Sequence, residues 1–158
     1  TKRLYISRMQ KACEIARRKG ATFNEAVVTA MGALESAWGT SRLAQEANNL
    51  FGIKAGTSWT GEVIELPTRE FHKGQWIEVV DRFRKYPSWN VCIVDFADII
   101  RTRPWFRDAL KYLNDPDLFL FALLPTPGKW GWSTDPQYFH KVKAVAREIE
   151  RLGGPKWH

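Results

Sequence analysis

The sequence predicts an α+β fold that is mostly α, with a helical body and one small β-hairpin lobe. Apolar residues recur at helical spacing through most of the 158 residues, whereas residues 58–85 are rich in β-prone side chains. No repeat, low-complexity tract or linker divides the chain, and its length suffices for a substantial core. We therefore expect a single domain over residues 1–158, with the β lobe at about 58–85.

The first part of the chain predicts three helices, over residues 3–19, about 23–38 and about 41–47. Thr22 and Glu25 fit a capping box at the start of the second helix, and Gly39 fits its C-terminal stop. Both ends of this second helix are therefore marked by local sequence signals.

The β lobe is predicted from two β-prone stretches, residues 61–66 and 76–83, joined by a turn at residues 72–75. Pro67 indicates a bend or an edge position, because proline cannot donate a ladder hydrogen bond. Glu70 lies near the tip of this predicted hairpin.

The second half of the chain returns to helix, over residues about 88–102, 104–113, 116–124 and from about 136 to 152. Ser88, Asp115 and Asp135 are typical N-cap residues, and a proline follows each of the two aspartates at the first helical position. Residues 125–132 contain two prolines and two glycines and are predicted to form a loop.

A net charge of +7 implies an anionic partner, which could be nucleic acid, a membrane surface or an acidic polymer such as a bacterial cell wall. No basic stripe with interleaved aromatic residues stands out, so we do not expect a nucleic-acid partner. No apolar run approaches the roughly 18 residues that span a bilayer. The first residues lack the apolar core of a signal peptide.

The sequence predicts neither a metal site nor a cofactor. His72, His140 and His158 do not cluster, and the cysteines lack metal-ligand spacing. Cys13 and Cys92 lie in apolar helical patterns and are expected to be small buried side chains; a disulfide between them stays open.

Glu35 is the main candidate for a catalytic residue. It lies in the last turn of the predicted helix 23–38, among apolar neighbours. Apolar surroundings and the negative end of the helix dipole both favour the protonated carboxyl. A carboxylic acid that stays neutral near pH 7 is what general-acid catalysis requires. The competing interpretation, a solvated surface glutamate, is the commoner one for any lone glutamate.

The motifs around Glu35 resemble those of the bacterial and phage glucosaminidases of glycoside hydrolase family 73. The resemblance begins at residues 33–39 (ALESAWG) and 48–54 (NNLFGIK) and spans roughly residues 20–150. It continues in family order through residues 59–61 (WTG), 68–71 (TREF), 82–88 (RFRKYPS), 95–98 (DFAD) and 133–138 (STDPQY). Each motif is weak alone, but the ordered set favours a catalytic Glu35.

The resemblance implies a lysozyme-like fold and a single catalytic domain that cleaves the β-1,4 glycan of bacterial peptidoglycan as an endo-β-N-acetylglucosaminidase. Glu35 matches the general acid, and Glu70 matches a second glutamate on a mobile β lobe. The expected substrate-binding residues are Trp38, Asn49, Phe51, Trp132 and Tyr138. Trp132 stands where the family usually has a tyrosine, and Tyr138 could instead pack the last helix.

Several alternatives stay open on the sequence. A muramidase or a lytic transglycosylase would act on the same polymer, because a lysozyme-like fold does not fix which bond is cut. An inverting, retaining or substrate-assisted route is equally compatible. A non-catalytic wall-binding module would need no buried acid. We expect a monomer that acts at the bacterial cell wall or periplasm, drawn by its charge; it resembles a phage endolysin or a domain of a larger bacterial autolysin.

Overall fold

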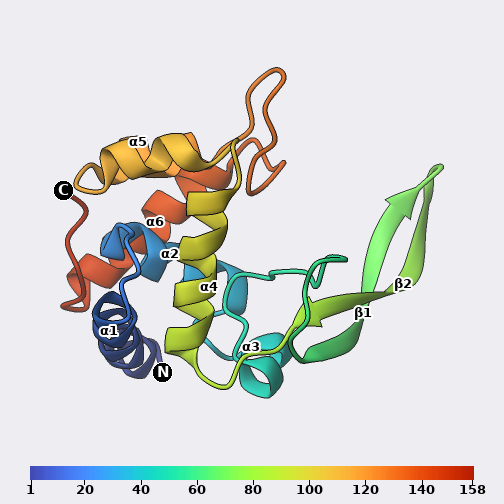
Figure 1. Cartoon of the computed structure of the whole chain (residues 1–158), viewed down its shortest axis with the longest axis horizontal. Helices are drawn as coiled ribbons and strands as arrows, with labels where there is room; N and C mark the ends of the chain where they lie inside the picture. The colour runs from blue at the N-terminus through green and yellow to red at the C-terminus, as the bar shows by residue number, and fades with distance from the viewer.

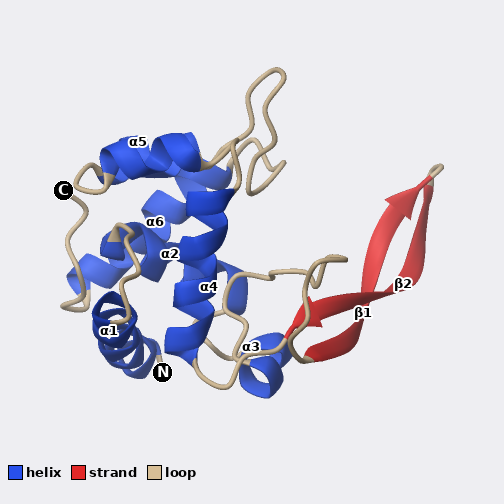
Figure 2. Cartoon of the chain, in the orientation of Figure 1, coloured by secondary structure: helices blue, strands red, loops and turns tan.

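The computed structural model describes all 158 residues as a helical body from which one long β-hairpin extends (Figures 1 and 2). Its elements are α1 (Lys2–Arg18), α2 (Glu25–Ser36), α3 (Arg42–Ala47), β1 (Val63–His72), β2 (Gln75–Arg84), α4 (Trp89–Thr102), the 3-10 helix η1 (Arg107–Tyr112), α5 (Pro116–Ala122) and α6 (Tyr138–Arg151). The predicted α+β class, mostly α with a hairpin lobe, is confirmed. None of these helices combines the length and the apolar character needed to cross a bilayer.

The core forms around α2, which packs against both α1 and α6. Val27, Val28 and Met31 are fully buried, because this helix is apolar on nearly all sides and is enclosed by its neighbours. The hydroxyl of Tyr5 on α1 donates to the carbonyl of Thr29 at 2.8 Å. The helix that carries Glu35 in its last turn is therefore held rigidly inside the body.

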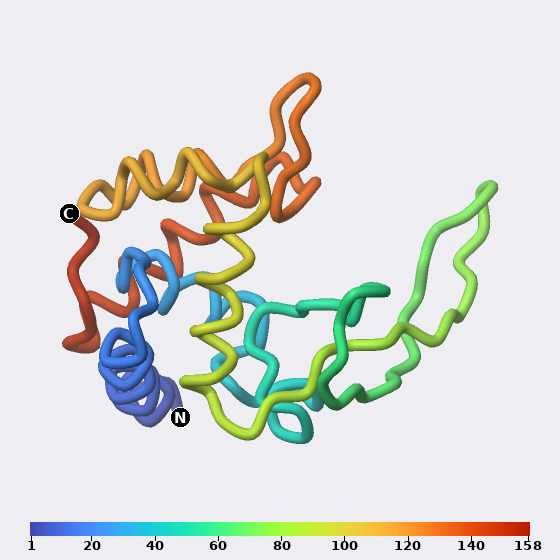
Figure 3. The backbone as a smooth tube through the Cα atoms, in the orientation of Figure 1, coloured from blue at the N-terminus to red at the C-terminus, as the bar shows by residue number.

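The two ends of the chain meet in the same body. The tail after α6 passes beside α1 (Figure 3), where the Arg3 guanidinium donates to the Leu152 carbonyl at 3.1 Å. Lys2 and Glu148 form an ion pair at 2.8 Å. Folding of the body thus depends on contacts between segments that lie far apart in the sequence.

The lobe is a two-stranded antiparallel sheet of β1 and β2, ten residues each, in which Leu66 lies opposite Asp81. The turn residues Lys73 and Gly74 both have positive φ, 49° and 79°, as a two-residue hairpin turn of type I′ requires. The strands run further towards the tip than predicted. Pro67 does not end β1, because both strands are edges and its missing N–H costs no ladder bond.

A buried polar network fixes the base of the lobe to α4. The carboxylate of Asp95 accepts from the Arg84 guanidinium at 2.9 Å and from the Tyr86 hydroxyl at 2.5 Å. The Arg84 Nε also donates to the Lys54 carbonyl at 3.1 Å. A hydrogen-bonded ion pair therefore holds the base of the lobe against the helical body.

Two predicted helix caps are wrong. α2 begins two residues later than a Thr22 capping box allows, because the N-cap is Asn24, which accepts from the Val27 amide at 3.1 Å. Asp135 does not cap α6 directly; it accepts from the Gln137 amide at 2.8 Å in a turn before the helix. In both places several cap-forming residues lie within a few positions, and tertiary packing selects which one is used.

Two further details differ from the expectation or resolve it. The segment predicted as a helix over 104–113 is a 3-10 helix over Arg107–Tyr112. Cys13 and Cys92 are both buried and both free, so no disulfide joins them.

Candidate active site

Glu35 is presented by an abrupt end of α2. The helix stops at Ser36, and the next three residues, Ala37, Trp38 and Gly39, all have positive φ, at 50°, 59° and 78°. The Ser36 hydroxyl holds this turn, because it accepts from the Gly39 amide at 2.8 Å. The predicted stop at Gly39 thus follows two left-handed residues, and the chain turns away just after the carboxyl.

A cavity of about 380 Å³ opens beside Glu35. Its walls come from the loop after α3, from the end of α4 with the start of η1, and from the loop before α6. The lining residues are Glu35, Phe51, Gly52, Ile53, Lys54, Gly56, Ile99, Arg103, Phe106, Gly131 and Trp132. A mixed apolar and polar concavity next to a carboxyl is the usual form of a small-ligand or substrate site.

Gly52 brings backbone close to the carboxyl. A Cβ atom at this position would lie 3.8 Å from Glu35 Oε2, and the φ of Gly52 is +66°, which favours glycine. This glycine belongs to the sequence motif at residues 48–54. The motif therefore shapes the wall that faces the acid.

The environment of Glu35 suits a general acid. The residue is open to the cavity on one side, yet the surrounding protein is dense enough that burial raises its pKa above the ordinary value of 4.5. An interaction with the Tyr138 hydroxyl lowers the pKa in part. The net shift of the Glu35 pKa is upward, which is the direction that general-acid catalysis requires.

Tyr138 stands at the start of α6 and is almost fully buried, at 3% exposure. Its hydroxyl is shielded from solvent and forms no well-aligned hydrogen bond in the structure. Burial, followed by the neighbouring Glu35 carboxylate, raises the pKa of Tyr138, so it stays a neutral donor. The sequence indicated either packing or substrate contact here; the structure adds a position next to the acid.

Two of the predicted substrate-binding aromatics line the cavity. Phe51 is buried at 2% exposure with its ring 4.6 Å from that of Phe96. Trp132 packs against the same Phe96 at 4.9 Å and against Phe106 at 5.7 Å. These four rings form one aromatic wall, of which Phe51, Phe106 and Trp132 face the cavity.

Trp38 and Asn49 do not line that cavity. The Trp38 ring packs against Tyr5 at 5.7 Å, with the Lys2 ammonium 4.9 Å from its centre. The Asn49 amide donates at 2.9 Å to the carbonyls of both Ile53 and Arg84. The side chains of Trp38 and Asn49 are thus occupied by contacts within the protein, and neither faces the cavity.

Glu70 lies on the hairpin and outside the cavity that holds Glu35. Alternate residues share one face of a strand, so Glu70 is on the face of β1 that carries the buried Leu66. The opposite strand places Ile77 across from it. The glutamate thus occupies an exposed position on a long lobe, and the structure does not bring the two carboxyls into one cavity.

Sequence reasoning missed Arg103 and Phe106, which both line the cavity. Arg103 directly follows α4, and Phe106 directly precedes η1. No local pattern separates these residues from others of their type. Their role depends on where the end of α4 lies relative to α2, which only the tertiary structure shows.

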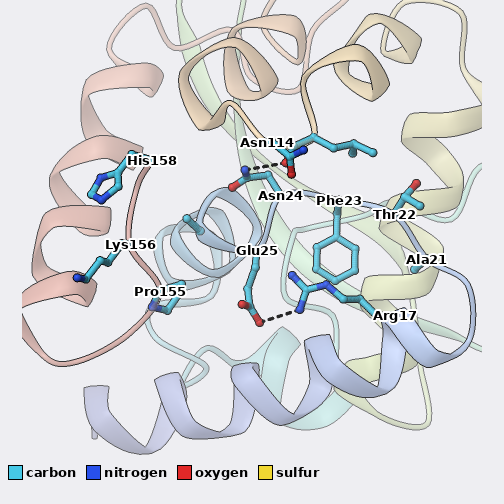
Figure 4. Close-up of a pocket in the computed structure, with 12 residues that line it drawn as sticks. Arg17, Ala21, Thr22, Phe23, Asn24, Glu25, Asn114, Pro155, Lys156 and His158 are labelled. Carbon is cyan, nitrogen blue, oxygen red and sulfur yellow. Dashed lines mark hydrogen bonds and ion pairs between the residues drawn. The ribbon is translucent and has the colours of Figure 1, made fainter.

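A larger cavity, of about 730 Å³, lies at the other end of α2, between the end of α1 and the C-terminal tail (Figure 4). Three of its polar side chains are already engaged. Arg17 pairs with Glu25 at 3.4 Å, and Asn24 donates to the Leu113 carbonyl at 2.9 Å. The one acidic side chain that lines this cavity, Glu25, is held in an ion pair, whereas Glu35 forms none, so Glu35 marks the candidate site.

The structure contains no group of three or more His, Cys, Asp or Glu side chains that could hold a metal ion. The charged or titratable side chains that line the cavity are Glu35, Lys54 and Arg103, and the buried hydroxyl of Tyr138 lies beside the acid.

Comparison with known proteins adds sequence relatives. Residues 10–151 match the family named Glucosaminidase, described as mannosyl-glycoprotein endo-beta-N-acetylglucosaminidase. Peptidoglycan hydrolase FlgJ of Pseudomonas aeruginosa is 32% identical over 127 residues, which are 78% of this chain and 31% of that protein. Exo-glucosaminidase LytG of Bacillus subtilis is 30% identical over 125 residues, 78% of this chain and 43% of that protein. The chain thus spans less than half the length of these curated relatives.

Solved structures show the same fold. A peptidoglycan hydrolase from a Sphingomonas species superimposes with a TM-score of 0.71 at 28% identity, covering 95% of this chain and 92% of that one. The catalytic domain of the autolysin Auto from Listeria monocytogenes gives a TM-score of 0.75 at 24% identity, covering 96% and 85%. The predicted lysozyme-like fold is therefore confirmed.

Proposed function

Because this chain belongs to the Glucosaminidase family, we propose that it hydrolyses the β-1,4-linked glycan of bacterial peptidoglycan as an endo-β-N-acetylglucosaminidase. The observation that carries the proposal is the Glu35 carboxyl, held at a helix end beside a substrate-sized cavity with its pKa raised by burial. A wall-binding module without catalysis would have no need of this arrangement.

Glu35 supplies the proton that the reaction needs. It protonates the glycosidic oxygen of the leaving sugar while positive charge develops at the anomeric carbon. Neutral Tyr138 stands beside the carboxyl and favours its ionised form, which is the form Glu35 takes once the proton has left. The aromatic wall with Phe51 and Trp132 offers apolar surface for sugar rings.

Glu70 is the proposed second carboxylate. Its position on an exposed lobe fits a group that reaches the substrate only when the lobe moves towards the cavity, as lobes and lids do in many enzymes. It would then act as a base for the attacking water. If the acetamido group of the substrate attacks instead, Glu70 assists that attack or matters less.

The test compares Glu35→Gln and Glu70→Gln with the unaltered protein on purified peptidoglycan sacculi, with folding checked by circular dichroism. Removal of the general acid should cost about 10²–10⁴-fold in rate. The Glu70 variant should lose less, since a water can be positioned imperfectly while the leaving group still needs its proton. Turnover at the unaltered rate by folded Glu35→Gln would rule out the proposed general acid.

Mass spectrometry of the products identifies the bond that is cut. An N-acetylglucosaminidase leaves fragments that end in reducing N-acetylglucosamine. Fragments that end in reducing N-acetylmuramic acid would instead show a muramidase, and anhydro ends would show a lytic transglycosylase. The same experiment thus separates the proposed activity from its two closest alternatives.

A further inference from the structure

The cavity beside Glu35 is also lined by a cationic side chain that pairs with no other group of the protein. Arg103 lines the cavity from the end of α4, and its guanidinium makes no ion pair and no hydrogen bond with any protein group. The other cavity cation, Lys54, is partly neutralised by Asp81 at 3.4 Å. Of the two cations that line the cavity, Arg103 is therefore the one with its full hydrogen-bonding capacity free for a ligand.

Arg103 does not serve Glu35 either. A guanidinium in contact with a carboxylate would lower the pKa of that carboxylate. The pKa of Glu35 is set by burial and by Tyr138, with no contribution from Arg103. Arg103 also forms no ion pair with Glu35, although both side chains line the same cavity.

The chemistry of Arg103 specifies the kind of group that it can hold. A guanidinium is planar, always charged, and presents donors in a fork that matches a carboxylate. In peptidoglycan, N-acetylglucosamine is neutral, whereas the muramic residue carries carboxylates, on its lactyl group when the peptide has been removed or on the attached stem peptide. The negative charge of the polymer therefore lies on the sugar that neighbours each N-acetylglucosamine.

We propose that Arg103 binds a carboxylate borne by a muramic residue, so that the enzyme prefers acidic strands over neutral ones of the same glycan. This inference rests on the proposed function. Ile99 and Phe106 lie beside Arg103 in the cavity wall, and the side chain of Arg103 is itself exposed, so its guanidinium is accessible to a carboxylate of a bound strand. Arg103 then sets substrate preference, and Glu35 performs the chemistry.

The test measures kcat/KM of Arg103→Ala, Arg103→Lys and the unaltered protein on two charged substrates. The first is stem-bearing strands, and the second is strands stripped of peptide by an amidase, which keep the lactyl carboxylate. Each is also used after carbodiimide coupling to methylamine, which neutralises its carboxylates. Arg107→Ala is the matched control, because Arg107 is exposed, unpaired and outside the cavity, and its removal changes net charge equally.

Arg103→Ala should lose about tenfold on a charged strand, in keeping with one hydrogen-bonded charge, and nothing on the neutralised strand. Arg103→Lys should fall between, and Arg107→Ala should match the unaltered protein. A loss confined to stem-bearing strands assigns the carboxylate to the peptide, and a loss confined to stripped strands assigns it to the lactyl group; either supports the inference.

Equal losses on charged and neutralised strands, or no loss on either, would overturn the role of Arg103. A failure of the proposed function looks different: the unaltered protein would then release no glycan fragments from any strand. Thermal melts followed by circular dichroism establish that each variant is folded before its kinetics are compared.

Discussion

The carboxyl of Glu35 lies under two opposing influences. Burial raises its pKa, and the Tyr138 hydroxyl lowers it by favouring the ionised form. The two residues come from opposite ends of the sequence, on α2 and α6. Tyr138 therefore acts as a positioning residue, which adjusts the proton affinity of the acid without being a reacting group.

Tyr138→Phe should move the alkaline limb of the kcat/KM profile to higher pH. Removal of the hydroxyl withdraws the influence that lowers the pKa of Glu35, so the acid keeps its proton to a higher pH than in the unaltered protein. Rates on sacculi across pH 4 to 9 would measure the shift. An unchanged limb, or one moved to lower pH, would contradict this role. Tyr112→Phe is the control, since Tyr112 does not influence the pKa of Glu35.

At this scale the sequence predicted the acid better than its surroundings. Glu35 could be found because its signals are local: a helix end, apolar neighbours and a motif. The proximity of Tyr138 and the free guanidinium of Arg103 depend on how helices distant in sequence pack together. Asn49 belongs to the motif, yet its amide is occupied by two backbone carbonyls, which only the folded loop supplies.

Among the elements, the hairpin depends most on one buried polar cluster. The side chain of Arg84 is only 7% exposed, and that of Asp95 is 18% exposed. Removal of one partner from such a pair leaves a buried charge without compensation. The orientation of the whole lobe relative to α4 therefore depends on Asp95.

Asp95→Ala should lower the free energy of unfolding by about 3–5 kcal/mol, the usual cost of orphaning a buried ion-pair partner. Asp98→Ala, one turn further along α4, should cost about 0–1 kcal/mol, because its pair with Arg101 is exposed. Urea unfolding of both variants gives the comparison. Similar losses for the two would show that the Asp95 network does not fix the lobe.

The helices and the hairpin were largely predictable, because helical periodicity, the hairpin turn and most helix caps depend on residues that lie close together in the sequence. The errors fall where two local signals compete. Thr22 and Asn24 are both good N-caps, and Asn24 is chosen because its amide also reaches the Leu113 carbonyl. At Pro67 the sequence indicated a bend or an edge position, and the edge position is confirmed, because β1 of the two-stranded sheet continues through this residue.

For the whole molecule, charge predicts behaviour towards the wall. With a net charge of +7, binding to sacculi should weaken as salt rises, because exposed charges are screened beyond about 8–10 Å near physiological ionic strength. Hydrolysis of a short neutralised glycan fragment should change much less. Pull-down with sacculi and fragment turnover, each from 50 to 500 mM salt, test this. Equal salt sensitivity in both assays would exclude net charge as the source of wall affinity.

The packing of α2 against α6 has a consequence for the time course of folding. Most helices and the hairpin close through contacts between neighbours in sequence, which form quickly. Glu35 meets Tyr138 only when the last helix docks on the second, a long-range event with a high entropic cost of chain closure. During refolding from denaturant, helical circular dichroism should therefore recover before activity does. The chain would therefore not hydrolyse glycan until α6 has docked on α2.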